Sequence, residues 1–478
     1  MFLMSYVPVI GLEIHARIKT RTKLFCRCAN EAVPVEANRH VCPICMGFPG
    51  MLPLLNEEAV RLATRACLAL GMTICPETKF DRKNYFYPDL PMGYQISQFD
   101  KPIGADGHLF IEQAGSAPRR IGIERLHMEN DAGKLSHFDD GSHVDYNRAG
   151  APLMEIVSMP EIFSVDDAKS YAEEMQLILR AVGSSDADME KGMMRFDANI
   201  SLRADSNAPF GTKVEIKNLN SFKALEKALA YEIDRQTRLL EKGETIVQET
   251  RGWDEGSGKT ISQRSKEIAA DYRYFPEPDL PPLSITQEHI DAERSKLPEL
   301  PFAKRERYKT IFKLDGEVAR LLVQQEDLAQ YFEQVAERTG NPKAAATWVT
   351  SILLAELSNA KERLEDLRFP VEDLARLITL VSEDAVSLLS AKETFSIMYA
   401  TGQKPDAIIA EKGFLQVSDD SALLALIDEV LAAFPLQRAE YAGGKTALLG
   451  FFVGQVMQRS KGSANPKKVG QLLLEKLS

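Results

Sequence analysis

The sequence predicts an α+β fold, with a large first domain built on antiparallel sheet and two helical domains after it. Residues 1–275 mix short β-type runs with a few well-marked helices. Six prolines then fall between residues 276 and 301, where they stiffen the backbone and remove hydrogen-bond donors that a sheet would need. From about residue 303 onward, apolar residues recur at helical spacing. We therefore expect domains at 1–290, 291–405 and 406–478.

Three helices of the first domain are marked by their first residues. Asn56, Ser164 and Ser221 each precede a run with apolar residues at helical spacing. A side-chain oxygen at such a position accepts a hydrogen bond from a backbone N–H that has no partner inside the helix. The helices are expected at 56–71, 164–183 and 221–242.

The composition is that of an ordinary soluble protein. The 478 residues are 44% hydrophobic and 27% charged, and the formal net charge is -11. This charge argues against uniform electrostatic capture of nucleic acid, although a local basic patch is compatible with it. The first twelve residues are apolar, but no basic segment precedes them, and no later run approaches the length of a membrane span. We expect a cytoplasmic protein without membrane contact.

Four pairs of polar residues in the first domain share one spacing. If each pair lies on a strand, both members point to the same face of the sheet, because side chains alternate along a strand. Such a face is rich in carboxylates, whose oxygens suit Mg²⁺, and Mg²⁺ usually bridges protein carboxylates to substrate phosphates. A solvated polar face is the alternative. The pairs are Glu13 and His15, Glu129 and Asp131, Asp197 and Asn199, and Glu215 and Lys217.

Four of the six cysteines form two short motifs, Cys26-x-Cys28 and Cys42-x-x-Cys45, separated by thirteen residues. At this spacing two knuckles can bring four thiolates around one tetrahedral Zn²⁺. Four sulfur ligands close the coordination shell, so the zinc would be structural and not catalytic. A set of reduced, unliganded cysteines is the alternative.

Cations accompany both the aromatic and the acidic residues of the first domain. Segments 83–87 and 271–275 place Lys83 and Arg273 among aromatic residues, which could stack on a base or ribose, or could be core strands. Guanidinium and ammonium groups near the acidic pairs suit the phosphate oxygens of a metal–nucleotide, or form a salt-bridge network. These cations are Arg148, Arg195, Arg203, Lys217 and Arg264.

The C-terminal end of the chain is basic. Residues 445–478 contain six cations against one anion, Glu475. A small basic helical unit at the end of an acidic chain could grip a phosphate backbone, although a basic terminus is also common on soluble surfaces.

Taken in order, ten segments resemble the B subunit of the bacterial aspartyl/glutamyl-tRNA amidotransferases. The resemblance spans the whole chain and is densest over 9–283. The segments are 9–15, 26–53, 81–89, 94–98, 125–134, 147–157, 195–203, 215–222, 271–279 and 461–466.

The resemblance implies a fold and a reaction. The first domain would be a cradle similar to glutamine synthetase, followed by a helical domain and a tail domain that grips tRNA. ATP would phosphorylate the side-chain carboxylate of Asp or Glu esterified to tRNA, and ammonia would displace the phosphate. The A subunit, an amidase, would release the ammonia from glutamine, and the small C subunit would wrap the other two. This agrees with the absence of a Gly-x-Ser-x-Gly nucleophile motif in this chain.

The resemblance also implies site residues. Glu13, His15 and Glu129 match positions at or beside the Mg²⁺ site, and Lys83 would contact phosphate or the reacting acyl group. Asn130 stands where the family more often has a second acid. The remaining expected residues are Asp197 and Glu215 for Mg²⁺, Arg195, Lys217 and Arg264 for ATP, and Lys461, Asn465, Lys467 and Lys468 for tRNA.

Two other functions remain open at this point. A non-catalytic tRNA-binding scaffold would have lost the acidic residues that this chain retains. A self-contained ligase acting on a free small molecule would leave the basic tail without a role. The sequence does not decide between Asp-tRNA(Asn) and Glu-tRNA(Gln) as substrate.

Overall fold

The computed structural model describes residues 6–31, 35–113, 115–265, 269–416, 420–460 and 464–477, without the side chains of 264, 265, 269 and 270. The chain divides into two compact units, 1–304 and 305–478. All named strands lie in the first unit, and the named elements of the second are helical. This confirms the predicted α+β class with a helical C-terminal part.

The first unit is built on a nine-stranded sheet with the order β14-β13-β12-β11-β1-β10-β7-β6-β2. Every neighbouring pair is antiparallel except β12 and β13, which are parallel. The predicted antiparallel sheet is therefore confirmed. The strands are β1 (Val7–Arg17), β2 (Thr73–Ile74), β6 (Gly104–Ile111), β7 (Arg119–Asn130), β10 (Pro152–Ser158), β11 (Met194–Arg203), β12 (Val214–Leu219), β13 (Glu249–Asp254) and β14 (Lys259–Ser265).

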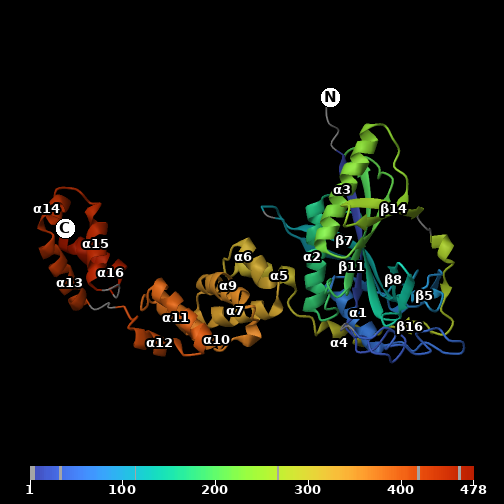
Figure 1. Ribbon diagram of the computed structural model, residues 1–478, viewed down its shortest axis with the longest axis horizontal. Coiled ribbons are helices and arrows are strands. Elements are labelled where there is room, and N and C mark those ends of the chain that lie inside the picture. Colours follow the sequence, from blue (N-terminus) through green and yellow to red (C-terminus); the bar gives the residue numbers. More distant parts are fainter. Residues whose placement is uncertain are drawn as a thin grey trace. The chain divides into compact units, whose positions relative to one another are not determined.

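Helices cover one face of this sheet (Figure 1). The helices α1 (Glu57–Ala69), α2 (Val165–Ala181) and α3 (Phe222–Glu241) begin after Asn56, Ser164 and Ser221, whose side chains accept backbone hydrogen bonds as predicted. Alternate strand residues such as Ile14 and Phe196 are fully buried in the core. Because side chains alternate along each strand, the polar residues between them point to the opposite face.

A small sheet with the order β15-β4-β5 joins the two aromatic segments singled out in the sequence. Phe275 of β15 (Phe275–Pro276) pairs with Arg82 of β4 (Asp81–Asn84), and β4 pairs with β5 (Tyr94–Ser97). Segments that are far apart in the sequence thus share one wall. Two further pairs complete the strands, β3 (Glu77–Thr78) with β16 (Leu283–Ser284) and β8 (Lys134–Phe138) with β9 (Gly141–Asp145).

An ion-pair cluster holds α4 (Gln287–Arg294) on α1. The carboxylate of Glu293, 2% exposed, accepts hydrogen bonds from Arg61 at 2.8 Å, Arg65 at 2.7 Å and Lys296 at 2.6 Å. Burial alone would raise the pKa of Glu293, but the three cations lower it to about 2.

The helices of the second unit form two apolar clusters. The first extends from Tyr308 to Ile409 and the second from Leu423 to Leu473. Because Ile408 and Ile409 belong to the first cluster, its packing continues past the boundary predicted at 405. Among the helices that the structure describes, none has an apolar stretch that could span a bilayer.

The helices from the junction onward are α5 (Pro301–Thr310), α6 (Gly316–Val323), α7 (Glu326–Thr339), α8 (Pro342–Thr347), α9 (Leu354–Ala360), α10 (Val371–Ser382), α11 (Leu388–Thr401), α12 (Pro405–Lys412), α13 (Asp420–Ala433), α14 (Pro435–Ala442), α15 (Leu448–Arg459) and α16 (Pro466–Leu477), with a π-helical turn at Trp348–Leu353.

Candidate active site and metal clusters

Strand register gathers the predicted polar pairs on the sheet face away from the helices. His15 of β1 lies opposite Glu155 of β10 and Arg195 of β11, and Glu155 lies opposite His127 of β7. Residues directly opposite each other in an antiparallel pair point to the same face. One row of the sheet therefore carries His127, Glu155, His15 and Arg195 side by side.

Two imidazoles and two carboxylates form a compact group in and beside this row. Nε2 of His15 lies 3.3 Å from Glu155 Oε2 and 3.9 Å from Glu129 Oε1, and Nε2 of His127 lies 3.2 Å from Glu155 Oε2 and 3.8 Å from Glu129 Oε2. All four residues are buried. The ligand atoms of His15, Glu129 and Glu155 lie within 4.8 Å of one another, so these three could hold one metal ion.

The protonation of this group reflects its charge balance. Burial opposes ionisation of Glu155, but His127 and then His15 hold the pKa of its carboxyl well below its usual range. Burial likewise opposes protonation of His127, but Glu155 and Glu129 raise its pKa to about 9. The carboxylates are thus anions that attract positive charge, which protons or a divalent cation can supply.

The structure separates Glu13 from this group. Glu13 lies opposite Asp197 of β11, on the same sheet face but in the neighbouring row. Its Oε1 accepts a hydrogen bond from Asn199 Nδ2 at 2.7 Å. Burial and the negative charge of Glu155 raise the pKa of Glu13.

Asp197 and Glu215 also lie beside the group and not in it. The ammonium of Lys217 is 3.7 Å from Asp197 and 3.8 Å from Glu215, and Thr250 donates to Glu215 at 2.6 Å. Of the five residues expected to bind Mg²⁺, the structure thus brings His15 and Glu129 within reach of one ion, together with Glu155. The other three contact different partners: Glu13 contacts Asn199, Asp197 contacts Lys217, and Glu215 contacts Lys217 and Thr250.

Lys83 enters a pocket of about 280 Å³ on this face, which His15, Glu129, Arg195, Asp197 and Lys217 also line. Its Nζ lies 5.1 Å from the ring centroid of Tyr272 and 6.0 Å from that of Tyr85. Burial would lower the pKa of Lys83, but the negative charge of Glu129 raises it. The ammonium is therefore a fixed cation beside the candidate metal ligands.

Arg195 reaches the same pocket with its guanidinium 3.4 Å from Asp131 Oδ1, and Arg148 lies 3.2 Å from the other oxygen of Asp131. Burial opposes the charge of Arg195, but Asp131 and Asp197 raise its pKa. Two of the three cations expected at ATP, Arg195 and Lys217, thus line one cavity. The side chain of the third, Arg264, lies outside the described residues.

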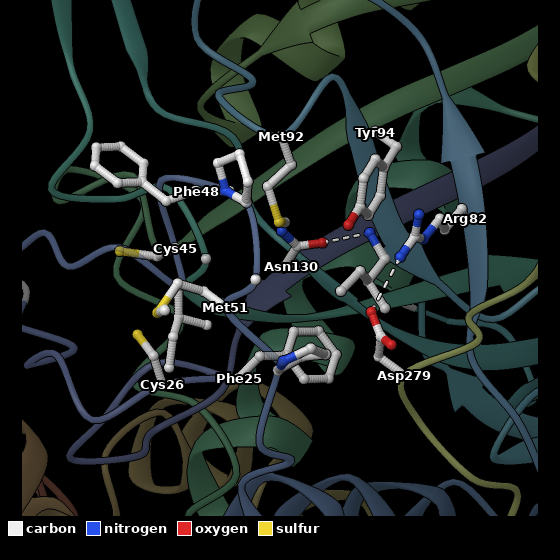
Figure 2. Close-up of a pocket in the computed structure, with 17 residues that line it drawn as sticks. Phe25, Cys26, Cys45, Phe48, Met51, Arg82, Met92, Tyr94, Asn130 and Asp279 are labelled. Atoms are coloured by element: carbon white, nitrogen blue, oxygen red, sulfur yellow. Dashed lines mark hydrogen bonds and ion pairs between the residues drawn. The ribbon is translucent and has the colours of Figure 1, made fainter.

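The four predicted zinc ligands come together. The sulfur atoms of Cys26, Cys28, Cys42 and Cys45 lie within 4.8 Å of one another, a fit for one tetrahedral metal ion. A hydrogen bond from Cys26, aided by the nearby charge of Lys23, lowers the pKa of Cys45 to about 5. Figure 2 shows Cys26 and Cys45 at one side of a second pocket, of about 210 Å³, with Arg82 and Tyr94 at another.

The residues expected to bind RNA occupy different environments. Asn465 is buried, and its side-chain oxygen accepts hydrogen bonds from the backbone N–H groups of Lys467 and Lys468, so it caps α16. The ammonium of Lys467 lies 3.1 Å from Asp384, and that of Lys468 lies 2.5 Å from Asp420. Lys461 lies outside the described residues.

Two residues of the site, Glu155 and His127, were missed by the sequence reasoning. His127 has the same spacing to Glu129 as the four recognised pairs. Glu155 is the charged residue in an otherwise uncharged strand, β10, and a buried charge in such a run signals a site. Both signals are visible in the sequence. Choosing these two residues over other polar residues requires knowing which strands are neighbours in the sheet.

Comparison with known proteins gives matches over nearly the whole chain. A family model described as the GatB/GatE catalytic domain matches residues 8–291, and a second, described as a GatB domain, matches residues 330–477. Proteins named as the B subunit of an aspartyl/glutamyl-tRNA(Asn/Gln) amidotransferase are similar in sequence. The one from Persephonella marina is 49% identical over 477 residues, covering 99% of this chain and 100% of the relative. The one from Carboxydothermus hydrogenoformans is 47% identical over 479 residues, covering 99% of each.

Proposed function

Because this chain belongs to the GatB/GatE family, we propose that it is the component of a tRNA amidotransferase that activates and amidates the aminoacyl group. The substrate would be Asp-tRNA(Asn), Glu-tRNA(Gln) or both, and the products Asn-tRNA(Asn) and Gln-tRNA(Gln). The observation that carries the proposal is the buried group of His15, Glu129 and Glu155 beside the pocket that Lys83 enters.

The chemistry explains why ATP is needed. A carboxylate is a poor acceptor for ammonia, because oxide would have to leave. Phosphorylation of the side-chain carboxylate supplies phosphate as a leaving group, and ammonia then forms the amide bond as the phosphate departs. The phosphoryl transfer requires positioning and neutralisation of negative charge more than covalent help from the protein.

Each group in the pocket has a role in this reaction. His15, Glu129 and Glu155 would hold Mg²⁺, which when bound neutralises charge on the transferring phosphoryl group. Lys83 holds a fixed positive charge toward the reacting acyl or phosphoryl oxygens. Arg195 and Lys217 contact further phosphate oxygens, and Asp131 orients Arg195.

The cysteine cluster has a structural role in the proposal. Four thiolates close the tetrahedral shell of Zn²⁺ and leave no open position for a substrate. The Zn²⁺ would fix the segment between β1 and α1. Metal analysis of fresh, reduced protein tests this directly. We expect one zinc ion per chain, and a protein without zinc would refute the proposal.

The reaction also requires partners. The names of the relatives designate one component of a larger enzyme, and we infer that this chain works in a complex with an amidase, the A subunit, and with the small C subunit. The complex would bind the misacylated tRNA, and the amidase would supply ammonia from glutamine. The tail predicted at 406–478, whose apolar cluster runs from Leu423 to Leu473, would contact tRNA through its exposed basic residues.

The test measures ATP-dependent amide formation on Asp-tRNA(Asn) and Glu-tRNA(Gln) by the purified complex. Ammonium chloride in place of glutamine removes any dependence on the amidase partner. Amide formation that requires ATP, and that Glu129→Gln abolishes without loss of tRNA binding, is the expected result. If neither tRNA is amidated by a complex that binds both, the proposal is wrong.

A further inference from the structure

A fully buried lysine lies against the cysteine cluster. The side chain of Lys23 is 0% exposed, and its Nζ lies 3.6 Å from Cys45 Sγ. The same ammonium donates to the backbone oxygens of His40 at 2.7 Å and Tyr146 at 3.3 Å. Lys23 thus contacts the cysteine knuckles and the segment that follows β9.

The burial of Lys23 is expensive without an anion. An ammonium in the protein interior loses its hydration, and a nearby negative charge is the interaction that offsets this loss best. Within the described residues, no carboxylate forms an ion pair with Lys23, and its two oxygen partners are neutral carbonyls. The cysteine sulfurs are therefore the groups that can supply negative charge.

The sulfur of Cys45 is arranged to carry such a charge. Besides the ammonium of Lys23, the backbone N–H of Cys42 points at it, with N and Sγ 3.2 Å apart. Donors aimed at one sulfur stabilise a thiolate more than a neutral thiol. Cys45 itself is only 5% exposed, so water does not substitute for these donors.

We propose that Lys23 is a positioning residue of the metal cluster: its fixed positive charge compensates the four thiolates and retains the ion. Four thiolates around a divalent cation leave a net charge of minus two in the interior, and one buried ammonium reduces it to minus one. The inference rests on the zinc proposed above and adds a residue outside the four ligands.

Lys23 also connects the cluster to the reaction pocket. Leu24, the next residue, donates its backbone N–H to Gly150 O at 3.0 Å, and Gly150 donates to Asp131 O at 2.8 Å. Gly150 has φ +86°, and an added Cβ would lie 3.3 Å from Cys45 Cβ and 3.5 Å from Lys23 Cδ.

The test uses the zinc-loaded full-length chain and measures the rate of zinc transfer to a chromogenic chelator. Lys23→Met keeps the length and burial of the side chain and removes its charge. We expect this variant to release zinc about 10- to 100-fold faster, because loss of a residue that supports metal ligands weakens metal affinity by about this factor. Lys79→Met is the matched control, because Lys79 is partly buried and paired with Asp81 and Asp100 instead of with sulfur.

Thermal unfolding separates charge compensation from ordinary packing. With zinc bound, Lys23→Met should lower the melting temperature. In stripped, reduced protein it should lower the melting temperature less, because the ammonium then faces fewer thiolates than in the zinc-bound cluster. Equal destabilisation of both forms, or wild-type zinc release, would overturn the role of Lys23. If Lys23→Met does not fold, Lys23→Arg and Lys23→Gln give the same comparison with and without charge. Absence of zinc from the wild-type protein would instead refute the zinc proposal.

Discussion

Replacing Glu155 by Gln should strongly weaken metal binding and leave the sheet intact. The substitution keeps the size of the side chain and removes one of two carboxylates from the candidate metal group. Glu155 Oε2 lies between two imidazoles, 3.3 Å from His15 Nε2 and 3.2 Å from His127 Nε2, so its charge acts on every part of the group.

The expected loss of metal affinity follows from the ligands that remain after the substitution. After the substitution the group offers one carboxylate, Glu129, and one imidazole, His15, to a divalent cation. The side chain of Glu155 is only 10% exposed, so bulk water does not replace the lost oxygen freely. Loss of a residue that merely supports a metal ligand weakens binding by about 10- to 100-fold. For a direct ligand we expect about 100-fold or more, which is about 2.7 kcal/mol.

The assay is a titration of the chain with Mn²⁺, followed by electron paramagnetic resonance, with Mg²⁺ as competitor. Glu77→Gln serves as control, because the side chain of Glu77 is 70% exposed and lies on a small separate strand. In the metal-free protein the pKa of His127 should also fall from about 9, since Glu155 is the largest influence raising it. Wild-type affinity for Mn²⁺ and Mg²⁺ in Glu155→Gln would refute the assignment of this group as the metal site.

Three further perturbations have defined outcomes. In denaturant titrations at pH 7, Glu293→Gln should lower the free energy of unfolding of the first unit by about 3 kcal/mol relative to the control Glu288→Gln. The folded-state pKa of Glu293, about 2, lies below the ordinary 4.5. The difference between the two variants should therefore shrink as the pH falls from 4.5 toward 2. Lys83→Met should reduce the rate constant of ATP-dependent amidation by about 100-fold with unchanged tRNA affinity, whereas Lys101→Met should not, and equal rates would remove Lys83 from the reaction. Deletion of 420–478, which leaves α12 in its apolar cluster, should weaken tRNA binding at least about tenfold in electrophoretic shifts, and unchanged affinity would place the tRNA contacts elsewhere.

Features that depend on local spacing could be read from the sequence. The helix starts at Asn56, Ser164 and Ser221 depend on a side chain and the backbone three residues away, and all three were predicted correctly. The cysteine motifs place pairs of sulfurs on short turns, and the cluster they predicted is present. The helical C-terminal part followed from apolar periodicity and from the prolines that precede it, and the sheet of the first domain from short β-type runs together with the family resemblance.

The composition of the metal group could not be read in this way. Spacing along one strand shows that Glu13 and His15 share a face, but not which residues of other strands lie opposite them. The strand order places β1 between β10 and β11, so Glu155 comes within 3.3 Å of His15 although the two are far apart in the sequence. Glu13, one row away, is instead bonded to Asn199.

The sequence by itself determined the fold class and the helix starts, because alternation, capping and motif spacing act between residues that are close in the chain. Longer segments that resemble a known family indicated the family. The tertiary structure alone decided which carboxylates can share one ion, and that a buried lysine faces the thiols. Those choices depend on strand order and register, which join residues far apart in sequence, and a shift of one residue would turn each side chain to the other face of the sheet.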